Sequence, residues 1–211
     1  MREPHLPRGK TLRPDLQLVA GMVPTGSRVL DLGCGDGDLL EYLIRVRGCD
    51  GHGVEISLDG FHACIDRGVP VMQADIDDGL GDFDDDSFDV VVLSQTLQAT
   101  RKPDMVLREM TRIGRRVIVS FPNFGHWSVR VQLGVFGRMP VSKALPYQWY
   151  DTPNIHFCTI KDFERLAGAE ELHVLKKVPL NGGGNAATGM KRRRPNVLAL
   201  GAVYLLESVH A

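Results

Sequence analysis

A short run rich in glycine and aspartate stands near the start of the sequence, directly after an apolar stretch. It is Asp31-Leu32-Gly33-Cys34-Gly35-Asp36-Gly37, with the spacing GxGxG. Glycine lets the backbone turn tightly and lets a ligand approach the main chain, because a side chain at such a position would fill that space. Between a strand and a helix, such a run indicates a nucleoside site at the carboxyl edge of a parallel sheet.

Two features separate this run from the dinucleotide fingerprint GxGxxG. Asp38 stands where that fingerprint has its third glycine, and the acidic Asp31 precedes the glycines at the end of the strand. Both departures weaken a nicotinamide interpretation. The run resembles the glycine loop of class I methyltransferases, which bind S-adenosylmethionine. The alternative is a tight strand-to-helix turn in a pocket that has lost its ligand.

Further acids end the next two predicted strands. Glu55 comes 20 residues after Gly35, where a carboxylate can accept both hydroxyls of a ribose, and Ile56 can pack against adenine. Asp75 ends the third strand, where a carboxylate can accept a hydrogen bond from the amine of adenine. The residues expected to line a pocket for S-adenosylmethionine or S-adenosylhomocysteine are Asp31, Gly33, Cys34, Gly35, Asp36, Gly37, Glu55, Ile56, Asp75, Ile76, Ser94 and Gln95.

Catalytic residues are not evident. The segment Ser94–Thr100 follows the fourth predicted strand, where a methyltransferase begins its acceptor site, and it offers no strong general base. Methyl transfer can proceed largely by proximity and alignment, so this absence does not exclude an enzyme. There is no GxSxG elbow and no Ser-His-Asp spacing.

Five short apolar runs alternate with helical patterns over the first 120 residues and supply the frame for these side chains. Such alternation produces a parallel sheet, because parallel neighbours cannot be joined by a tight turn. Pro103 is suited to open the third helix and Gly114 to close it. The predicted strands are Ser27–Leu32, Gly51–Glu55, Val69–Ala74, Phe88–Ser94 and Arg116–Phe121, and the helices lie around Leu39–Ile44, Leu58–Ile65 and Val106–Ile113.

The last third of the sequence departs from this alternation. Thr159, with Asp162 three residues on, is typical of a helix N-cap, and that helix should end at Gly168. Two strands joined without a helix should be antiparallel. The predicted strands are Leu172–Pro179 and Val197–Leu206, separated by the glycine-rich stretch Asn181–Pro195.

The expected fold is therefore α/β: a Rossmann-like class I methyltransferase sandwich, with a mostly parallel seven-stranded sheet and a C-terminal antiparallel hairpin. Residues 1–211 are expected to form a single domain, with an N-terminal arm at 1–14 and an insertion at 124–153.

Composition narrows the function classes. The chain has a formal charge of −1 and 43% hydrophobic residues, which argues for a folded core and against nucleic acid as the main partner. The basic run Lys191–Arg194 is the only support for a nucleic-acid methyltransferase and is expected to be solvated. The eight aspartates within Asp75–Asp89 lack the spacing of a calcium loop, and the four cysteines lack that of a zinc site, so no metal is expected. With no membrane segment and no signal peptide, a cytoplasmic location is expected.

Several blocks of the chain, over about Leu12 to Glu170, resemble the methionine biosynthesis protein MetW family. The glycine loop is shared by class I methyltransferases in general, whereas SFPNFGHW (Ser120–Trp127) and LPYQWYDTPNIHFCTI (Leu145–Ile160) are more specific. The resemblance implies a methyltransferase-like protein that associates with a homoserine O-acyltransferase of the MetX type and supports O-acylation of homoserine in methionine synthesis.

Two functions from different classes follow. The first is an accessory subunit of that acyltransferase, whose nucleoside pocket senses S-adenosylmethionine or S-adenosylhomocysteine. The alternative is an S-adenosylmethionine-dependent methyltransferase that acts on a small molecule. The insertion is rich in aromatic residues, which anchor many interfaces, and it serves either as a docking surface or as a lid packed on its own core. These aromatics are Trp127, Phe136, Tyr147, Trp149 and Tyr150.

Overall fold

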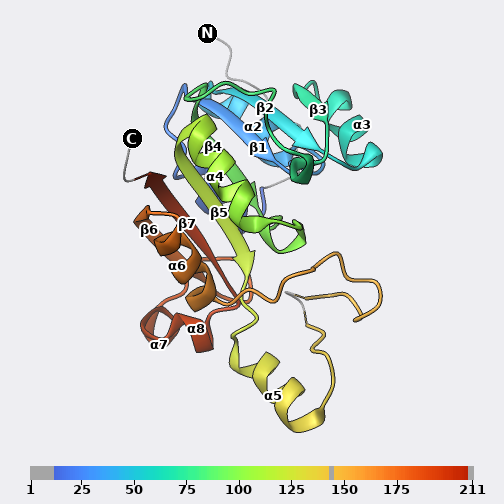
Figure 1. Ribbon diagram of the computed structural model, residues 1–211, viewed down its shortest axis with the longest axis vertical. Coiled ribbons are helices and arrows are strands. Elements are labelled where there is room, and N and C mark those ends of the chain that lie inside the picture. Colours follow the sequence, from blue (N-terminus) through green and yellow to red (C-terminus); the bar gives the residue numbers. More distant parts are fainter. Residues whose placement is uncertain (1–11, 143–144, 209–211) are drawn as a thin grey trace.

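The computed structural model describes residues 12–142 and 145–208, and its centre is one seven-stranded sheet (Figure 1). The strand order is β3-β2-β1-β4-β5-β7-β6. The first five strands are parallel, and β7 runs antiparallel to both β5 and β6. The strands are β1 (Arg28–Leu32), β2 (Asp50–Glu55), β3 (Val71–Gln73), β4 (Phe88–Ser94), β5 (Gly114–Pro122), β6 (Leu172–Leu180) and β7 (Gly201–Ser208).

Helices cover both faces of this sheet and produce two apolar cores. One core packs α1, α2 and α3 against the sheet, and the other packs α4 and α6 against the opposite face. The helices are α1 (Pro14–Ala20), α2 (Asp38–Arg47), α3 (Leu58–Asp66), α4 (Pro103–Ile113), α5 (Trp127–Phe136), α6 (Ile160–Ala169), α7 (Gly189–Arg193) and α8 (Pro195–Leu198), with the 3-10 turns η1 (Ile76–Asp78) and η2 (Leu97–Ala99).

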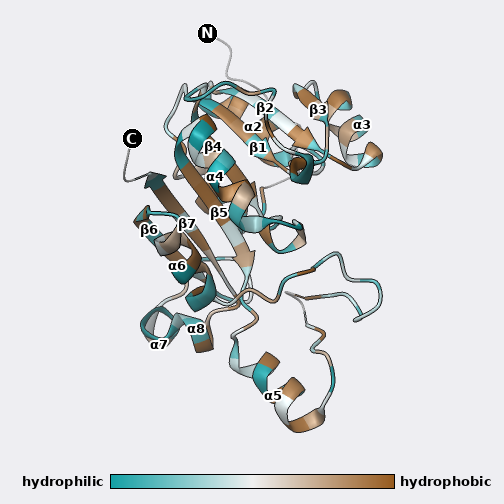
Figure 2. Ribbon diagram, viewed as in Figure 1, coloured by the Kyte–Doolittle hydropathy of each residue, from teal (hydrophilic) through white to brown (hydrophobic). Residues whose placement is uncertain are grey.

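The central strand β4 shows why both faces are covered. Val90 and Val92 belong to the first core, whereas Val91 and Leu93 belong to the second, and all four are at most 1% exposed. Successive side chains of a strand point to opposite faces, so an uninterrupted apolar run requires cover on both sides. The hydropathy colouring of β4 and β5 follows this pattern (Figure 2).

The predicted fold is confirmed, and most predicted elements lie at their expected places. Thr159 and Asp162 form a reciprocal capping box at the start of α6, which ends at Ala169, one residue beyond the expected Gly168. Gly114 follows α4 as predicted, but in an extended conformation that already begins β5. A Cβ on Gly114 would lie 2.5 Å from Cγ2 of Val91, so close strand packing requires glycine there.

Two predictions for the C-terminal region were wrong. The run Val197–Leu206 is not one strand, because Pro195–Leu198 forms α8 and β7 begins only at Gly201. The two strands are also not joined without a helix, since Gly189–Arg193 forms α7 within the stretch Asn181–Pro195. Proline at the first position of α8 favours a helix start, and a continuous apolar run does not distinguish a strand from a short helix.

Residues 124–142 and 145–158 belong to an arm that leaves the carboxyl end of β5, projects away from the sheet with α5, and returns to α6 (Figure 1). Sequence analysis expected an insertion at 124–153 but no helix within it. The N-terminal arm expected at 1–14 lies mostly outside the described residues, and α1 already begins at Pro14. Within the described part of the chain, no helix is long and apolar enough to cross a bilayer.

Candidate functional site

The glycine loop lies between β1 and α2, at the place where the strand order reverses. β1 has β2 on one side and β4 on the other. In open parallel sheets, ligands bind beyond the carboxyl ends of the strands at such a switch point. The carboxyl ends of β1, β2, β3 and β4 and the loops that follow them meet at this edge of the sheet, which we call the crevice. These strand ends and loops contain every residue predicted to line the pocket.

All three loop glycines have a positive φ, between +58° and +77°, but for two of them the surrounding side chains add a second constraint. A Cβ on Gly33 would lie 2.7 Å from Oγ1 of Thr96, and one on Gly37 would lie 2.9 Å from Sγ of Cys64. Around Gly35, a Cβ would meet no described atom within 4 Å. Gly33 and Gly37 are thus fixed by packing, whereas Gly35 opens onto space that a ligand can fill.

Glu55 is held in place by backbone donors from two loops. Its Oε2 accepts the N–H of Gly35 and its Oε1 accepts the N–H of Ser57, both at 2.8 Å. The side chain is buried, and each carboxylate oxygen keeps a second lone pair for a ribose hydroxyl. Beside it, Ile56 is 62% exposed, which provides an uncovered apolar surface for an aromatic base.

Asp31 is the most unusual side chain of the crevice. It is 3% exposed, and its Oδ1 has no hydrogen-bond partner among the described residues. Burial, reinforced by the charge of Glu55, raises the pKa of Asp31 from 3.8 to about 8. A buried acceptor without a partner is costly, and a cationic donor such as an α-ammonium group would satisfy it.

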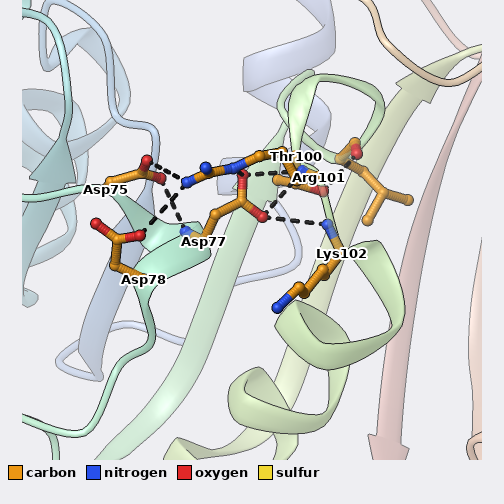
Figure 3. Close-up of polar contacts among 7 residues, drawn as sticks. Asp75, Asp77, Asp78, Thr100, Arg101 and Lys102 are labelled. Carbon is orange, nitrogen blue, oxygen red and sulfur yellow. Dashed lines mark hydrogen bonds and ion pairs between the residues drawn. The ribbon is translucent and has the colours of Figure 1, made fainter.

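Asp75 lies in a network centred on Arg101, whereas Ile76, the first residue of η1, packs against the core that contains α4 and α6. Oδ1 of Asp75 accepts the N–H of Asp77 at 2.9 Å, and Oδ2 pairs with Nη2 of Arg101 at 2.8 Å. The carboxylate of Asp77 accepts the backbone N–H groups of Arg101 and Lys102. Figure 3 shows the carboxylates turned toward the guanidinium from the loop that contains η1. The adenine contact expected of Asp75 stays a prediction.

Ser94 and Gln95 lie at the carboxyl end of β4 and are tied to Ser120 of β5. The two serine hydroxyls are 3.0 Å apart, and the Gln95 N–H donates to the carbonyl of Ser120 at 2.9 Å. Gln95 has a φ of +59°, which is uncommon for a residue with a side chain. Strained backbone of this kind is often found at functional sites, and here it turns the chain into η2 at the rim of the crevice.

Cys34 and Asp36 connect the glycine loop to neighbouring residues through their side chains. Cys34 is a buried free thiol with its Sγ 3.7 Å from that of Cys64, and burial raises the pKa of both thiols. Asp36 forms an ion pair with Arg67 at 3.0 Å. Cys64, Arg67 and Arg101 could not be singled out from the sequence, because each reaches its partners from a distant segment and none belongs to a motif. Thr96 lies in the predicted segment Ser94–Thr100 but was not assigned to the pocket.

A separate cavity of about 470 Å³ lies beside the crevice. Gln95 and Pro122 border it from the ends of β4 and β5, Asn181 from the end of β6, and Arg13 and Asp15 from the start of α1. Its position next to the strand ends is where a second reactant would be placed. Among the described residues that line it, the ionisable ones are Arg13, Asp15 and Tyr147.

Metal ligation finds no support in the aspartate-rich segment after β3. Asp85 pairs with Arg112 at 2.7 Å and Asp89 with Arg28 at 3.0 Å, so arginines neutralise carboxylates outside the Arg101 network as well. Within residues 12–142 and 145–208, no group of three histidine, cysteine, aspartate or glutamate side chains could hold a metal ion.

Comparison with known proteins gives one family and one fold. A family model described as methionine biosynthesis protein MetW matches residues 13–206. The bifunctional methionine biosynthesis protein MetXA/MetW of Rhodopirellula baltica is 38% identical over 174 residues, which are 78% of this chain and 28% of that protein. The chain therefore spans less than a third of that relative's length.

The solved structures are similar in fold at low identity. An S-adenosylmethionine-dependent methyltransferase of Mesorhizobium loti has a TM-score of 0.67 at 15% identity, with 90% of this chain and 96% of that chain covered. One from Thermotoga maritima has a TM-score of 0.64 at 20% identity, with 92% and 87% covered. The architecture is that of class I methyltransferases.

Proposed function

The chain belongs to the MetW family of methionine biosynthesis proteins, and on that premise we propose that it associates with a homoserine O-acyltransferase of the MetX type and supports its acyl transfer. The observation that carries the proposal is the relative from Rhodopirellula baltica, which joins MetXA and MetW in one polypeptide. A covalent link gives two modules a high effective concentration, and such a link favours modules that work in contact.

The crevice of the proposed subunit binds S-adenosylmethionine or S-adenosylhomocysteine as a regulatory ligand. Three observations on this chain support the fit: the open space at Gly35, the fixed carboxylate of Glu55 beside the exposed Ile56, and the unpartnered acceptor of Asp31. Both adenosyl compounds offer a ribose diol, an adenine ring and an α-ammonium group. Glu55 would hold the diol, Ile56 the ring and Asp31 the ammonium group.

Hydrogen bonds made by Gln98 connect the rim of the crevice to the arm. The carbonyl oxygen of Gln98, in η2, accepts the N–H groups of Ile155 at 2.8 Å and His156 at 3.0 Å. Nε2 of Gln98 donates to the carbonyl of Gln95 at 2.6 Å. The returning segment of the arm is therefore hydrogen-bonded to the loop that borders the proposed ligand site. A ligand that shifts this loop would change the arm's affinity for a partner, provided that it binds the free and complexed states unequally.

The experiment mixes the purified chain with the acyltransferase and measures association by sedimentation velocity and acyl transfer by product formation. Each is repeated with saturating S-adenosylhomocysteine. We expect a complex, higher acyl transfer in the complex, and a dependence of either quantity on the ligand. A chain that neither binds the enzyme nor changes its rate would contradict the proposal. A complex indifferent to the ligand would retain the accessory role and remove the sensing role.

A second candidate, methyl transfer to a small molecule, is favoured by the 470 Å³ cavity between Gln95 and Asn181. That cavity lies where an acceptor would approach a bound cofactor, and alignment alone accelerates such a transfer considerably. Incubation of the chain with methyl-labelled S-adenosylmethionine and a metabolite extract tests it. Labelled products that disappear with a Gly35→Val variant would support methyl transfer. Their absence over a broad range of acceptors would argue against it.

A further inference from the structure

We propose that the acyltransferase docks on a basic and apolar pole of this chain, formed by α5, residues 145–158, α7 and α8. We call these residues the docking pole. The inference rests on the proposed function and adds to it the surface and the chemistry of its counterpart: an apolar protein face with an acidic rim.

The helix α5 has an apolar composition without a core to cover it. Within this helix, all of which is described, only Val129 is buried. Leu133 is 57%, Val135 72% and Phe136 67% exposed. Figure 2 shows the apolar colouring of α5 at a distance from the sheet. Contiguous exposed apolar surface on a water-facing helix usually marks an interaction site.

The returning part of the arm and the helix α7 enlarge this surface. Trp149 is 72% and Tyr150 71% exposed, and their rings contact each other edge to face. Phe157 and Met190 are also more than half exposed. Tryptophan, tyrosine, phenylalanine, methionine and arginine are the residues enriched at the centres of protein interfaces.

The root of the arm is fixed, so the pole is a preformed platform. Asn123 is 2% exposed, and its Nδ2 donates to the carbonyl of Ala199 at 2.8 Å and that of Asn196 at 3.1 Å. Its Oδ1 accepts the N–H groups of Gly125 and Ile160. A small core of Phe124, Val129 and Leu145 lies above this root. A platform ordered before binding loses less entropy on association.

The two sequence segments that contain the pole, residues 124–158 and 181–198, carry a charge opposite to that of the rest of the chain. Residues 124–158 have three lysines and arginines and one aspartate, and residues 181–198 have four and no acid, so these segments carry +2 and +4. Since the chain carries −1, the remainder carries −7. The two segments adjoin, because a Cβ on Gly125 would lie 2.8 Å from the carbonyl oxygen of Asn196.

The positive charge of these two segments favours one kind of binding partner for the apolar surface over the others. A second copy would place one basic pole against another, because a two-fold interface pairs the same patch on both subunits. Like charges brought together in this way oppose association. A partner with acidic groups around an apolar centre meets both features, and the relative that joins MetXA to MetW supports the acyltransferase as that partner. Anionic membranes and RNA share only the charge and serve as outcomes of the test.

The test compares matched variants of the full chain for binding to the acyltransferase. Phe136→Ala and Trp149→Ala truncate exposed side chains of the pole, and Ile65→Ala truncates a side chain that is 53% exposed on α3. We expect each pole variant to weaken the affinity by about tenfold or more and the α3 variant by less than about twofold. All three side chains are largely exposed, so the variants should fold.

A second pair of variants tests the charge. Arg192→Glu with Arg193→Glu reverses two charges on α7, and Arg115→Glu with Arg116→Glu reverses two at the opposite end of β5. Only the α7 pair should slow association and reduce its dependence on salt.

The outcomes separate the inference from the function on which it rests. If the wild-type chain does not bind the acyltransferase, the proposed function fails and the pole loses its partner. If the wild type binds and the pole variants bind equally well, the accessory role is supported and the assignment of the docking pole as the binding surface is wrong. Binding of the wild type, but not of the α7 variant, to phosphatidylglycerol vesicles or to RNA, with unchanged binding to the acyltransferase, would also overturn the inference.

Discussion

The backbone N–H of Gly35 donates to the carboxylate of Glu55 at 2.8 Å, which joins the loop after β1 to the acid at the end of β2. The same carboxylate accepts the N–H of Ser57, so neither oxygen can rotate freely. The acid that would hold a ribose is thus oriented before any ligand arrives. Preorganised donors and acceptors bind more tightly because less ordering is needed on association.

Asp31→Asn is expected to stabilise the chain near neutral pH. In the folded state the pKa of Asp31 is raised to about 8 by burial and by Glu55, whereas its ordinary value is 3.8. The unfolded chain therefore releases a proton that the folded chain keeps, and stability falls as the pH rises from about 4 to about 8. This contribution approaches roughly 4 kcal/mol at pH 7 as an upper limit. Urea unfolding between pH 4 and pH 8 measures it, and an asparagine variant with the wild-type slope would contradict the expectation.

The same carboxyl should couple ligand binding to proton release. An ammonium group next to Asp31 favours the carboxylate, so S-adenosylhomocysteine should bind more tightly as the pH rises from about 6 to about 8. Calorimetry in buffers of different ionisation enthalpy measures the released proton. The asparagine variant should lose this buffer dependence. Equal heats for the wild type in all buffers would show that Asp31 does not meet the ligand.

Asp77→Ala should cost more stability than Arg101→Ala. Asp77 is 9% exposed and accepts two backbone N–H groups, whereas the Arg101 side chain is 58% exposed and is easily replaced by water. Loss of Asp77 leaves backbone donors without partners, at about 2 kcal/mol, while loss of the arginine should cost less than about 1 kcal/mol. Chemical denaturation of both variants tests the order. The reverse order would show that the ion pairs in Figure 3, rather than the backbone caps, hold this loop.

Asn123→Ala should loosen the arm at its root. The buried amide joins the end of β5 to α6 and α8, so its removal leaves several backbone groups unpaired, at a cost of about 3 kcal/mol. Hydrogen exchange should then increase over residues 124–158. Asn185→Ala is a suitable control, because Asn185 is exposed and donates only to the nearby carbonyl of Gly183 through its side chain. Equal effects of the two variants would contradict the role assigned to Asn123.

The sheet could be predicted from the sequence because each strand is an apolar run with a clear boundary. The alternation in β4 requires cover on both faces, and the capping box at Thr159 marks the start of α6. The membership in the MetW family, expected from blocks such as SFPNFGHW, is confirmed. The helices α1, α5, α7 and α8 were missed. The last three lie in glycine-rich or aromatic stretches that show no amphipathic period.

Only those site residues that belong to a sequence motif could be predicted. Gly35 and Glu55 are adjacent in space, as their spacing suggested. Arg101 could not be found in advance, because the carboxylates around it are 23 to 26 residues away in sequence. The unpartnered oxygen of Asp31 depends on burial from every side, which no local pattern encodes.

Calorimetric titration of the purified chain with S-adenosylhomocysteine tests the central claim most directly, with Gly35→Ala and Gly26→Ala as matched variants. Both glycines have a positive φ and open space where the alanine methyl group would lie, so both substitutions carry similar strain, about 1 kcal/mol. Only Gly35 faces the crevice. The account predicts saturable binding of one ligand by the wild type and by Gly26→Ala, with at least about tenfold weaker binding by Gly35→Ala. No heat with either adenosyl compound, or equal binding by both variants, would contradict it.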